Sequence, residues 1–338
     1  MNADSISKKN KPKVQVILSI DTEEEWDWSG PFPEQNPDVT NVQELPAFQA
    51  YCSDLGIRTT YFLDYAVIDN HESVNTLKEI AKRGDVEYGA HLHPWVNPPF
   101  FGVTTESCSH VVNLPIEQVR EKLCELTEKI TATFGKKPIS FRTGRWGING
   151  DILNLLVEQE YLFDSSIYPH YKNKFFDCTG AETKPFWPSL QQTDLSDTSG
   201  NQRSILEVPV STGFNRHAFH FWNNLHETFT KPPFSFLHVN GILWHSHLLR
   251  KLYLSPELCT SEQMISLGKT LLAKGQRIFH LYLHSSSLLD NATEMSAHVN
   301  AREQLTQRLD EFLSWLSEHC EVEYKTLSEA GQSWIDND

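Results

Sequence analysis

The sequence predicts an α/β fold, a distorted (β/α)7–8 barrel made of a single domain with one helical or irregular insertion. Two observations support this fold class. Short apolar segments alternate with segments of helical period along most of the chain, as expected for a parallel sheet covered by helices. Polar residues that can do chemistry follow directly after several apolar segments, and a β/α barrel carries its active site at the carboxyl ends of its strands.

The expected strands are short runs rich in β-branched and aromatic residues, which favour extended structure. In chain order they are Val14–Ile20, Arg58–Leu63, Val86–Leu92, Pro138–Phe141, Tyr161–Asp164, Ile205–Val210, Ile278–His284 and Val322–Thr326. The expected helices have apolar residues at helical spacing, and three of them stop at glycines. They are Val42–Leu55, Ser73–Arg83 with Ser73 as its cap, Pro115–Phe134, Asp151–Gln159 and Val299–Glu318.

Residues 13–338 are expected to form the single domain, preceded by a disordered tail over residues 1–12. Gln191–Arg203 is polar, and we expect a surface loop there because the strand series continues on both sides of it. Residues 212–256 are rich in Trp, Phe and His and are less regular. We expect this insertion to cover one rim of the barrel and to contribute to substrate choice.

The composition argues against several classes of partner. The 338 residues carry a formal net charge of −15, which disfavours a nucleic acid or an anionic membrane surface. No stretch approaches the roughly 20 apolar residues of a membrane span, and the lysine-rich start lacks the apolar core of a signal peptide. The six cysteines are scattered without a Cys-x-x-Cys pair, unlike a disulfide framework. We therefore expect a cytoplasmic protein.

Two strand ends carry groups that suit a metal ion. His91 and His93 are one residue apart in an extended segment, so their side chains leave the same face of the strand. Asp21 and Glu23 share a face in the same way at the end of the first strand. If these strand ends are neighbours, they form a His/His/carboxylate site with a spare carboxylate beside it. Three protein ligands with an open coordination position are typical of a hydrolytic metal site.

The residue types also indicate how such a site would work. A divalent metal polarises an acyl carbonyl and acidifies water, and zinc is the default for imidazole and carboxylate ligands. Asp21 is the expected base, kept ionised by Arg142, and His284 is the expected acid for the leaving amine. Asp164 is a candidate acceptor that orients one of the histidines.

Five segments, each at a strand end, resemble in their order the motifs of the polysaccharide deacetylase family, carbohydrate esterase family 4. They are Asp21-Thr22-Glu23, His91-Leu92-His93, Phe141–Gly147, Asp164–Pro169 and Leu281–His284. The resemblance spans nearly the whole chain. It implies a distorted β/α barrel that removes N- or O-acetyl groups from sugars with the help of a divalent metal, usually zinc.

The resemblance also implies roles for individual residues. It makes Asp21 the base, Glu23, His91 and His93 the metal ligands, and His284 the acid, with Arg142 and Asp164 in the third and fourth motifs. Arg145, Trp146 and Trp95 are candidates for substrate binding, because aromatic side chains at a barrel rim stack on sugar rings. Trp28 is a further aromatic of this kind.

Two departures from the family pattern leave alternatives open. The family places its two ligand histidines four residues apart, and the residue four after His91 is Trp95. Either His93 is the second ligand, or it comes from another histidine, among His110, His170, His217, His220, His245 and His247. The acid pair contains an inserted residue and a glutamate in place of an aspartate, so Glu24 competes with Glu23 as the ligand.

These features predict a metal-dependent hydrolase that removes an N-acetyl or other small acyl group from a sugar or glycan precursor, in surface polysaccharide biosynthesis. A carbohydrate is the expected partner, and a nucleic acid is not. Two alternatives remain: a non-catalytic glycan-binding module with this fold, and a deformylase or amidohydrolase that acts on a C–N bond outside polysaccharides. The oligomeric state is left open by the sequence.

Overall fold

The structure is a computed structural model, and it describes residues 11–27, 30–191, 203–232, 234, 236–294 and 296–337. The expected tail over residues 1–12 and the expected loop Gln191–Arg203 lie almost entirely outside the described residues, and Trp28 lies outside them as well.

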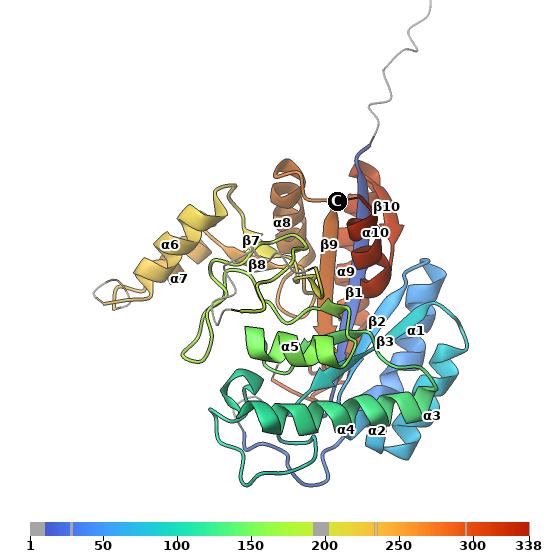
Figure 1. Ribbon diagram of the computed structural model, residues 1–338. Helices are drawn as coiled ribbons and strands as arrows, with labels where there is room; N and C mark the ends of the chain where they lie inside the picture. The colour runs from blue at the N-terminus through green and yellow to red at the C-terminus, as the bar shows by residue number, and fades with distance from the viewer. Residues whose placement is uncertain are drawn as a thin grey trace, which may run out of the picture.

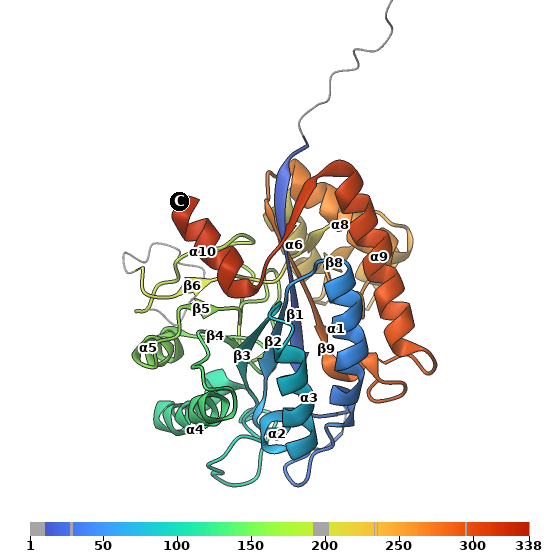
Figure 2. The ribbon, with the colours of Figure 1, turned by 90° about the vertical axis from the view of Figure 1, so that its right-hand side faces the viewer.

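The described residues form one parallel sheet of eight strands, which runs through the middle of the molecule (Figures 1 and 2). The strands are β1 (Lys13–Thr22), β2 (Thr59–Leu63), β3 (Val86–Leu92), β4 (Ser140–Thr143), β5 (Phe163–Asp164), β6 (Leu206–Glu207), β9 (Ile278–His284) and β10 (Glu321–Tyr324). From β1 the order runs through β2, β3, β4 and β5 to β6, while β9 pairs with the other side of β1. The predicted parallel sheet is confirmed.

The sheet curls into a distorted barrel. After β6 the chain reaches back to β9, where the backbone N–H of Ser211 donates to the carbonyl of His280 at 3.0 Å. Polar side chains from strands that are not neighbours also meet inside: Arg142 on β4 donates to Ser19 on β1 at 3.0 Å and lies 3.3 Å from Nε2 of His280 on β9. Such contacts are possible only across the interior of a closed or nearly closed sheet. The predicted (β/α) barrel is therefore confirmed.

Helices cover the outer face of the sheet (Figure 2). They are α1 (Leu45–Asp54), α2 (Tyr65–Asp69), α3 (His71–Ala81), α4 (Ile116–Phe134), α5 (Gly150–Glu158), α8 (Ser261–Ala273) and α9 (Ala301–His319). Helix α10 (Leu327–Asn337) instead packs against side chains of the inner face, among them Ile17, Phe62 and Phe163. Short 3₁₀ segments add Thr40–Glu44, Val111–Asn113 and Ser285–Leu288. The sequence analysis did not predict α2, α8 or α10, although α8 begins at a capping box formed by Thr260 and Gln263.

The ends of the helices follow from local chemistry. Gly135 ends α4 in the left-handed conformation, φ 70°, and its N–H donates to the carbonyl of Thr131 at 2.8 Å. The cap predicted for α3 is wrong by three residues. Asn70, not Ser73, is the cap, because its side chain accepts from the N–H groups of Glu72 and Ser73, each at 3.0 Å.

The insertion over residues 212–256 contains an antiparallel pair, β7 (Thr212–Phe214) and β8 (Lys251–Tyr253), and two helices, α6 (Phe219–Phe229) and α7 (Val239–His245). Figure 1 shows α6 and α7 projecting from the side of the barrel. Lys274, which lies just before the amino end of β9, donates to the carbonyl of His217 at 3.5 Å. β7 and β8 pack against α8, and Tyr253 on β8 stacks on Tyr168 at a centroid distance of 5.4 Å. The expectation that this insertion covers one rim of the barrel stays a prediction.

No helix among the described residues combines the length and the apolar character that crossing a membrane requires.

Candidate active site

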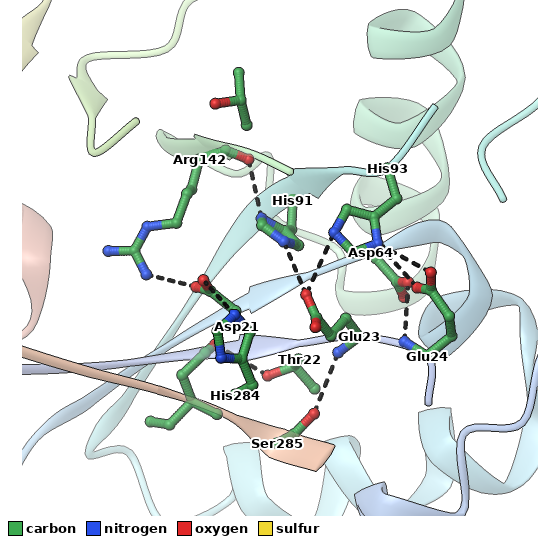
Figure 3. Close-up of polar contacts among 12 residues, drawn as sticks. Asp21, Thr22, Glu23, Glu24, Asp64, His91, His93, Arg142, His284 and Ser285 are labelled. Atoms are coloured by element: carbon green, nitrogen blue, oxygen red, sulfur yellow. Dashed lines mark hydrogen bonds and ion pairs between the residues drawn. The ribbon is translucent and has the colours of Figure 1, made fainter. Parts of the chain in front are cut away.

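The register of the sheet brings the predicted site residues to one edge. Asp21 at the end of β1 pairs with His284 at the end of β9, and His91 at the end of β3 pairs with Arg142 on β4. All of these strands run in the same direction, so their carboxyl ends lie together. Figure 3 shows the resulting group, with Glu23 between the two histidine rings and Asp21 beside Arg142.

Glu23, His91 and His93 converge as a metal site would require. Oε2 of Glu23 lies 3.2 Å from Nε2 of His91 and 3.3 Å from Nε2 of His93, and all three residues are almost completely buried. Among the described residues, Nε2 of His93 is a buried polar atom without a hydrogen-bond partner. Nε2 of His91 is within hydrogen-bond distance of Glu23, but three possible ligand atoms this close together, one of them unpaired, also fit a cation between them.

The other ring nitrogen of each histidine, Nδ1, is hydrogen-bonded to a group outside this cluster of possible ligands. Nδ1 of His91 donates to the backbone carbonyl of Arg142 at 3.1 Å, which leaves the lone pair on Nε2. Nδ1 of His93 lies 3.0 and 3.1 Å from the two carboxylate oxygens of Glu24. Metal-binding histidines are usually fixed in this way by an acceptor on the far nitrogen. Glu24 therefore lies behind His93 rather than beside Glu23.

Glu24 has a buried environment of its own. Its backbone N–H donates to Oδ2 of Asp64 at 3.2 Å, and Nε1 of Trp95 donates to its carboxylate. Burial raises the pKa of Glu24 to about 7 and the pKa of Asp64 above its ordinary value. Trp95 is fully buried and its ring stacks on His93 at a centroid distance of 4.3 Å. The prediction that Trp95 binds substrate is wrong, because its packing under His93 leaves no face open to a ligand.

A second group of possible metal ligands, Glu24, Asp64 and His93, shares His93 with the first. None of the six other candidate histidines belongs to either group among the described residues. His110, for example, packs against the ring of Phe175 at a centroid distance of 4.4 Å.

Asp21 is held by a fully buried arginine. Nη1 of Arg142 donates to Oδ1 of Asp21 at 2.5 Å, and Nη2 donates to the hydroxyls of Ser19 and Ser165 at 3.0 and 2.9 Å. Burial by itself would raise the pKa of Asp21. The positive charge of Arg142, together with His91 and His284, outweighs burial and lowers the pKa below its ordinary value. Asp21 is thus an ionised carboxylate beside the possible metal ligands.

His284 is oriented by a residue that the sequence analysis missed. Its Nδ1 lies 2.7 Å from Oε1 of Glu257, and its backbone N–H donates to Oε2 of the same carboxylate at 3.0 Å. The opposite nitrogen, Nε2, lies 3.9 Å from Oδ2 of Asp21. Burial lowers the pKa of His284, but the charges of Glu257, Glu23 and Asp21 dominate and raise it to about 10. His284 is therefore a protonated imidazole at neutral pH.

Asp164 does not reach this group. Its carboxylate accepts from the hydroxyl of Ser166 at 2.6 Å and lies beside the buried carboxyl of Glu207. Because side chains alternate along a strand, Ser165 faces Arg142 and Asp164 faces the other way. The expectation that Asp164 orients a site histidine is wrong, and Glu257 has that position instead.

A cavity of about 180 Å³ opens next to these groups. Its lining is given by Asp21, Glu23, His91, Thr143, Arg145, Trp146, Tyr168, Glu257, Leu258, Tyr282 and His284. The ring of Trp146 stacks on Tyr168 at 4.8 Å and meets Tyr282 edge-on at 5.4 Å. The cavity therefore has a polar floor and an aromatic wall.

Arg145 and Trp146 both have left-handed backbone conformations, with φ of 62° and 61°. Residues other than glycine rarely adopt this conformation. Arg145 lines the cavity, as expected of a substrate-binding residue, and it is also paired with Glu106 at 3.1 Å and with the hydroxyl of Ser109 at 2.6 Å. Backbone strain next to a cavity is typical of a functional turn.

No protein-family model matches the sequence, and no curated protein sequence is detectably similar to it. Solved structures are similar in fold. A protein from Mycobacterium smegmatis, provisionally assigned as a polysaccharide deacetylase, superposes with a TM-score of 0.55 at 17% identity, over 97% of this chain and 92% of that one. A Pseudomonas aeruginosa PAO1 protein with a similar provisional assignment gives 0.52 at 14% identity, over 95% and 90%.

The allantoinase PuuE is equally similar, with a TM-score of 0.52 at 13% identity over 96% of this chain and 91% of that chain. At these identities the likeness establishes the fold. The chain has the barrel that these deacetylase-like and allantoinase proteins share, and its chemistry has to be argued from its own residues.

Proposed function

We propose that this protein is a metal-dependent hydrolase that removes an acetyl or other small acyl group from the nitrogen of a sugar in a glycan precursor. The observation that carries the proposal is the convergence of Glu23, His91 and His93 beside two further groups, the Asp21–Arg142 pair and the His284–Glu257 pair. A ligand set, an ionised base and a protonated acid at one cavity form the set that hydrolysis of an amide needs.

The three convergent residues fit a divalent metal, and zinc is the best match to two imidazoles and one carboxylate. Glu23 would bind through its carboxylate, and His91 and His93 through Nε2. When bound there, the metal would supply a Lewis acid for the acyl oxygen and lower the pKa of water.

The chain's own residues supply the proton transfers. Asp21, which Arg142 keeps ionised, accepts the proton of the attacking water. His284, which Glu257 keeps protonated, donates a proton to the leaving nitrogen. Oδ2 of Asp21 and Nε2 of His284 are 3.9 Å apart. The base and the acid can therefore act on the same bound substrate group.

The cavity supports a small substrate group. Its volume of about 180 Å³ is below the roughly 300–1,000 Å³ of pockets that enclose drug-sized ligands. Trp146, Tyr168 and Tyr282 form an apolar wall that suits a sugar face or an acyl methyl group. A cavity of this size holds the acyl group and part of one sugar residue, and a nucleotide-linked or lipid-linked intermediate of surface polysaccharide synthesis is the substrate that we propose.

A second candidate is hydrolysis of a C–N bond in a small amide that is not a sugar. Two observations favour it: the likeness in fold to an allantoinase and the limited volume of the cavity. The same base, acid and ligand residues would serve this reaction. The third possibility, a non-catalytic glycan-binding module, does not account for a buried ionised base and a protonated acid that line one cavity.

One assay separates the three. The zinc-loaded protein is incubated with a panel of N-acetylated sugars and sugar nucleotides, and acetate is measured; in parallel it is incubated with allantoin and related ureides. Acetate release that disappears in Asp21→Asn supports the proposal. Ureide hydrolysis without acetate release supports the second candidate. Stoichiometric zinc and tight binding of a sugar without any hydrolysis would identify a binding module.

A further inference from the structure

A second cavity lies away from the candidate active site. It has a volume of about 280 Å³ and opens between His170, the start of α6 and the turn Lys274–Gln276 that leads into β9. The turn lies at the amino end of β9, whereas His284 lies at its carboxyl end. The two cavities share no lining residue.

His170 lines this cavity and lacks the partners that a buried imidazole needs. The residue is 1% exposed, yet among the described residues neither Nδ1 nor Nε2 makes a hydrogen bond of ordinary geometry. The backbone of Thr179 is close enough to favour protonation of the ring, but it satisfies neither nitrogen fully. Buried polar groups nearly always have a hydrogen-bond partner, so we expect this ring to bind a partner inside the cavity.

Several other groups around the cavity are basic side chains. Lys184, His220 and Lys274 line it, and Glu182 is the one acidic residue among its lining residues. Lys251 approaches from the protein side, where its Nζ donates to the carbonyl of His170. This excess of basic groups stands out in a chain whose net charge is −15.

The basic groups are close enough to act on one another. The rings of His170 and His220 have centroids 6.0 Å apart, and Nζ of Lys274 lies 4.4 Å from the ring of Phe219, which contacts His170. Burial first, and then the charges of Lys251, His220 and Lys274, lower the pKa of His170 to about 3. Nearby positive charge therefore disfavours protonation of this unpaired ring, and Glu182 is the acidic side chain that lines the cavity.

We propose that this cavity binds a small oxyanion, a phosphate group that is either free or carried on a small molecule. A phosphate oxygen can accept from the His170 ring N–H and from the ammonium of Lys274, and it offsets the local positive charge. The cavity is larger than a bare phosphate needs, so a phosphate ester also fits. The proposal does not depend on the hydrolytic function.

Isothermal titration of the full chain with inorganic phosphate, and separately with AMP, tests the proposal. Wild type should bind one equivalent of at least one of these ligands. Lys274→Gln should weaken that binding tenfold or more, and His170→Phe should abolish it. Lys269→Gln is the matched control, because it removes the same charge from an exposed position on α8 outside the cavity.

The two ligands distinguish the sources of the anion. Tighter binding of phosphate indicates a free anion, and tighter binding of AMP indicates a phosphate ester. The proposal is overturned if neither ligand gives saturable binding up to about 10 mM. It is also overturned if Lys274→Gln and Lys269→Gln weaken binding equally, because the effect would then be non-specific. Lys274 is exposed, so this variant keeps the test valid even if His170→Phe does not fold.

Discussion

Glu257 holds His284 at two points: one carboxylate oxygen lies 2.7 Å from Nδ1 of the ring, and the other accepts from the backbone N–H at 3.0 Å. The imidazole is thereby fixed with Nε2 turned towards Asp21. In the proposed reaction this contact determines both the direction and the proton affinity of the acid.

Replacing Glu257 by Gln should move the alkaline limb of the kcat profile to lower pH. The pKa of His284 is raised to about 10, so the acid form is present through neutral pH and is lost as pH rises through that value. Removing the negative charge of Glu257 lowers this pKa, and activity should be lost at least one pH unit earlier. Glu262→Gln, an exposed acid on α8, is the control. An unchanged alkaline limb would show that Glu257 does not set the acid.

Substitution of either His91 or His93 by Ala should abolish binding of one zinc per chain, because each supplies an Nε2 that faces Glu23. Glu24→Gln should retain the site but weaken zinc binding by about 10–100-fold, the usual effect of losing an outer hydrogen-bond partner. Metal content after dialysis against a graded chelator measures both effects. His71→Ala, an exposed histidine on α3, should leave metal content unchanged. Full zinc in His93→Ala would mean that another residue is the second ligand.

Asp21→Asn should reduce the rate by at least ~10²–10⁴-fold, the range for loss of a general base, while zinc content stays near one per chain. The amide still offers an oxygen to Arg142, so the fold should survive, although the buried guanidinium loses its counter-charge. Single-turnover acetate release and the melting temperature are the measurements. Near wild-type release would assign the base to another group.

Trp146→Ala should raise KM about 3–10-fold and change kcat little, because the ring offers a stacking surface of ~0.5–1.5 kcal/mol rather than a reacting group. Trp146 stacks on Tyr168 in the cavity wall, so the loss should concern substrate binding. Trp334→Ala, on α10 outside this cavity, should leave KM unchanged. An equal fall in kcat with constant KM would place Trp146 in the chemistry instead.

The strand-end residues were predictable because they depend on local rules. Asp21, His91 and His284 each end an apolar strand, and parallel strands bring their carboxyl ends to one edge whatever their separation in sequence. The alternation of side chains along a strand was enough to turn His91 and His93 to the same side.

The residues that were missed depend on packing between distant segments. Glu257 follows the irregular insertion, and no local pattern links it to His284. Trp95 has the aromatic character of a sugar platform, and only the fold shows that it lies beneath His93. Asp164 sits in a motif-like segment, but the register of β5 turns Ser165, not Asp164, towards Arg142. Strand β5 has only two residues. A strand this short gives no alternating pattern in the sequence from which the face of each side chain could be predicted.

The end of β1 and the two residues after it place three carboxylates: Asp21 at Arg142, Glu23 at the two histidine rings, and Glu24 on the far side of His93. Their directions are fixed by the phase of the chain rather than by the identity of each residue. Loss or gain of one residue between Asp21 and Glu23 would displace Glu23 and Glu24 by one position relative to Asp21. The spacing between Asp21 and Glu23 is therefore a constraint of its own, in addition to the identity of each carboxylate.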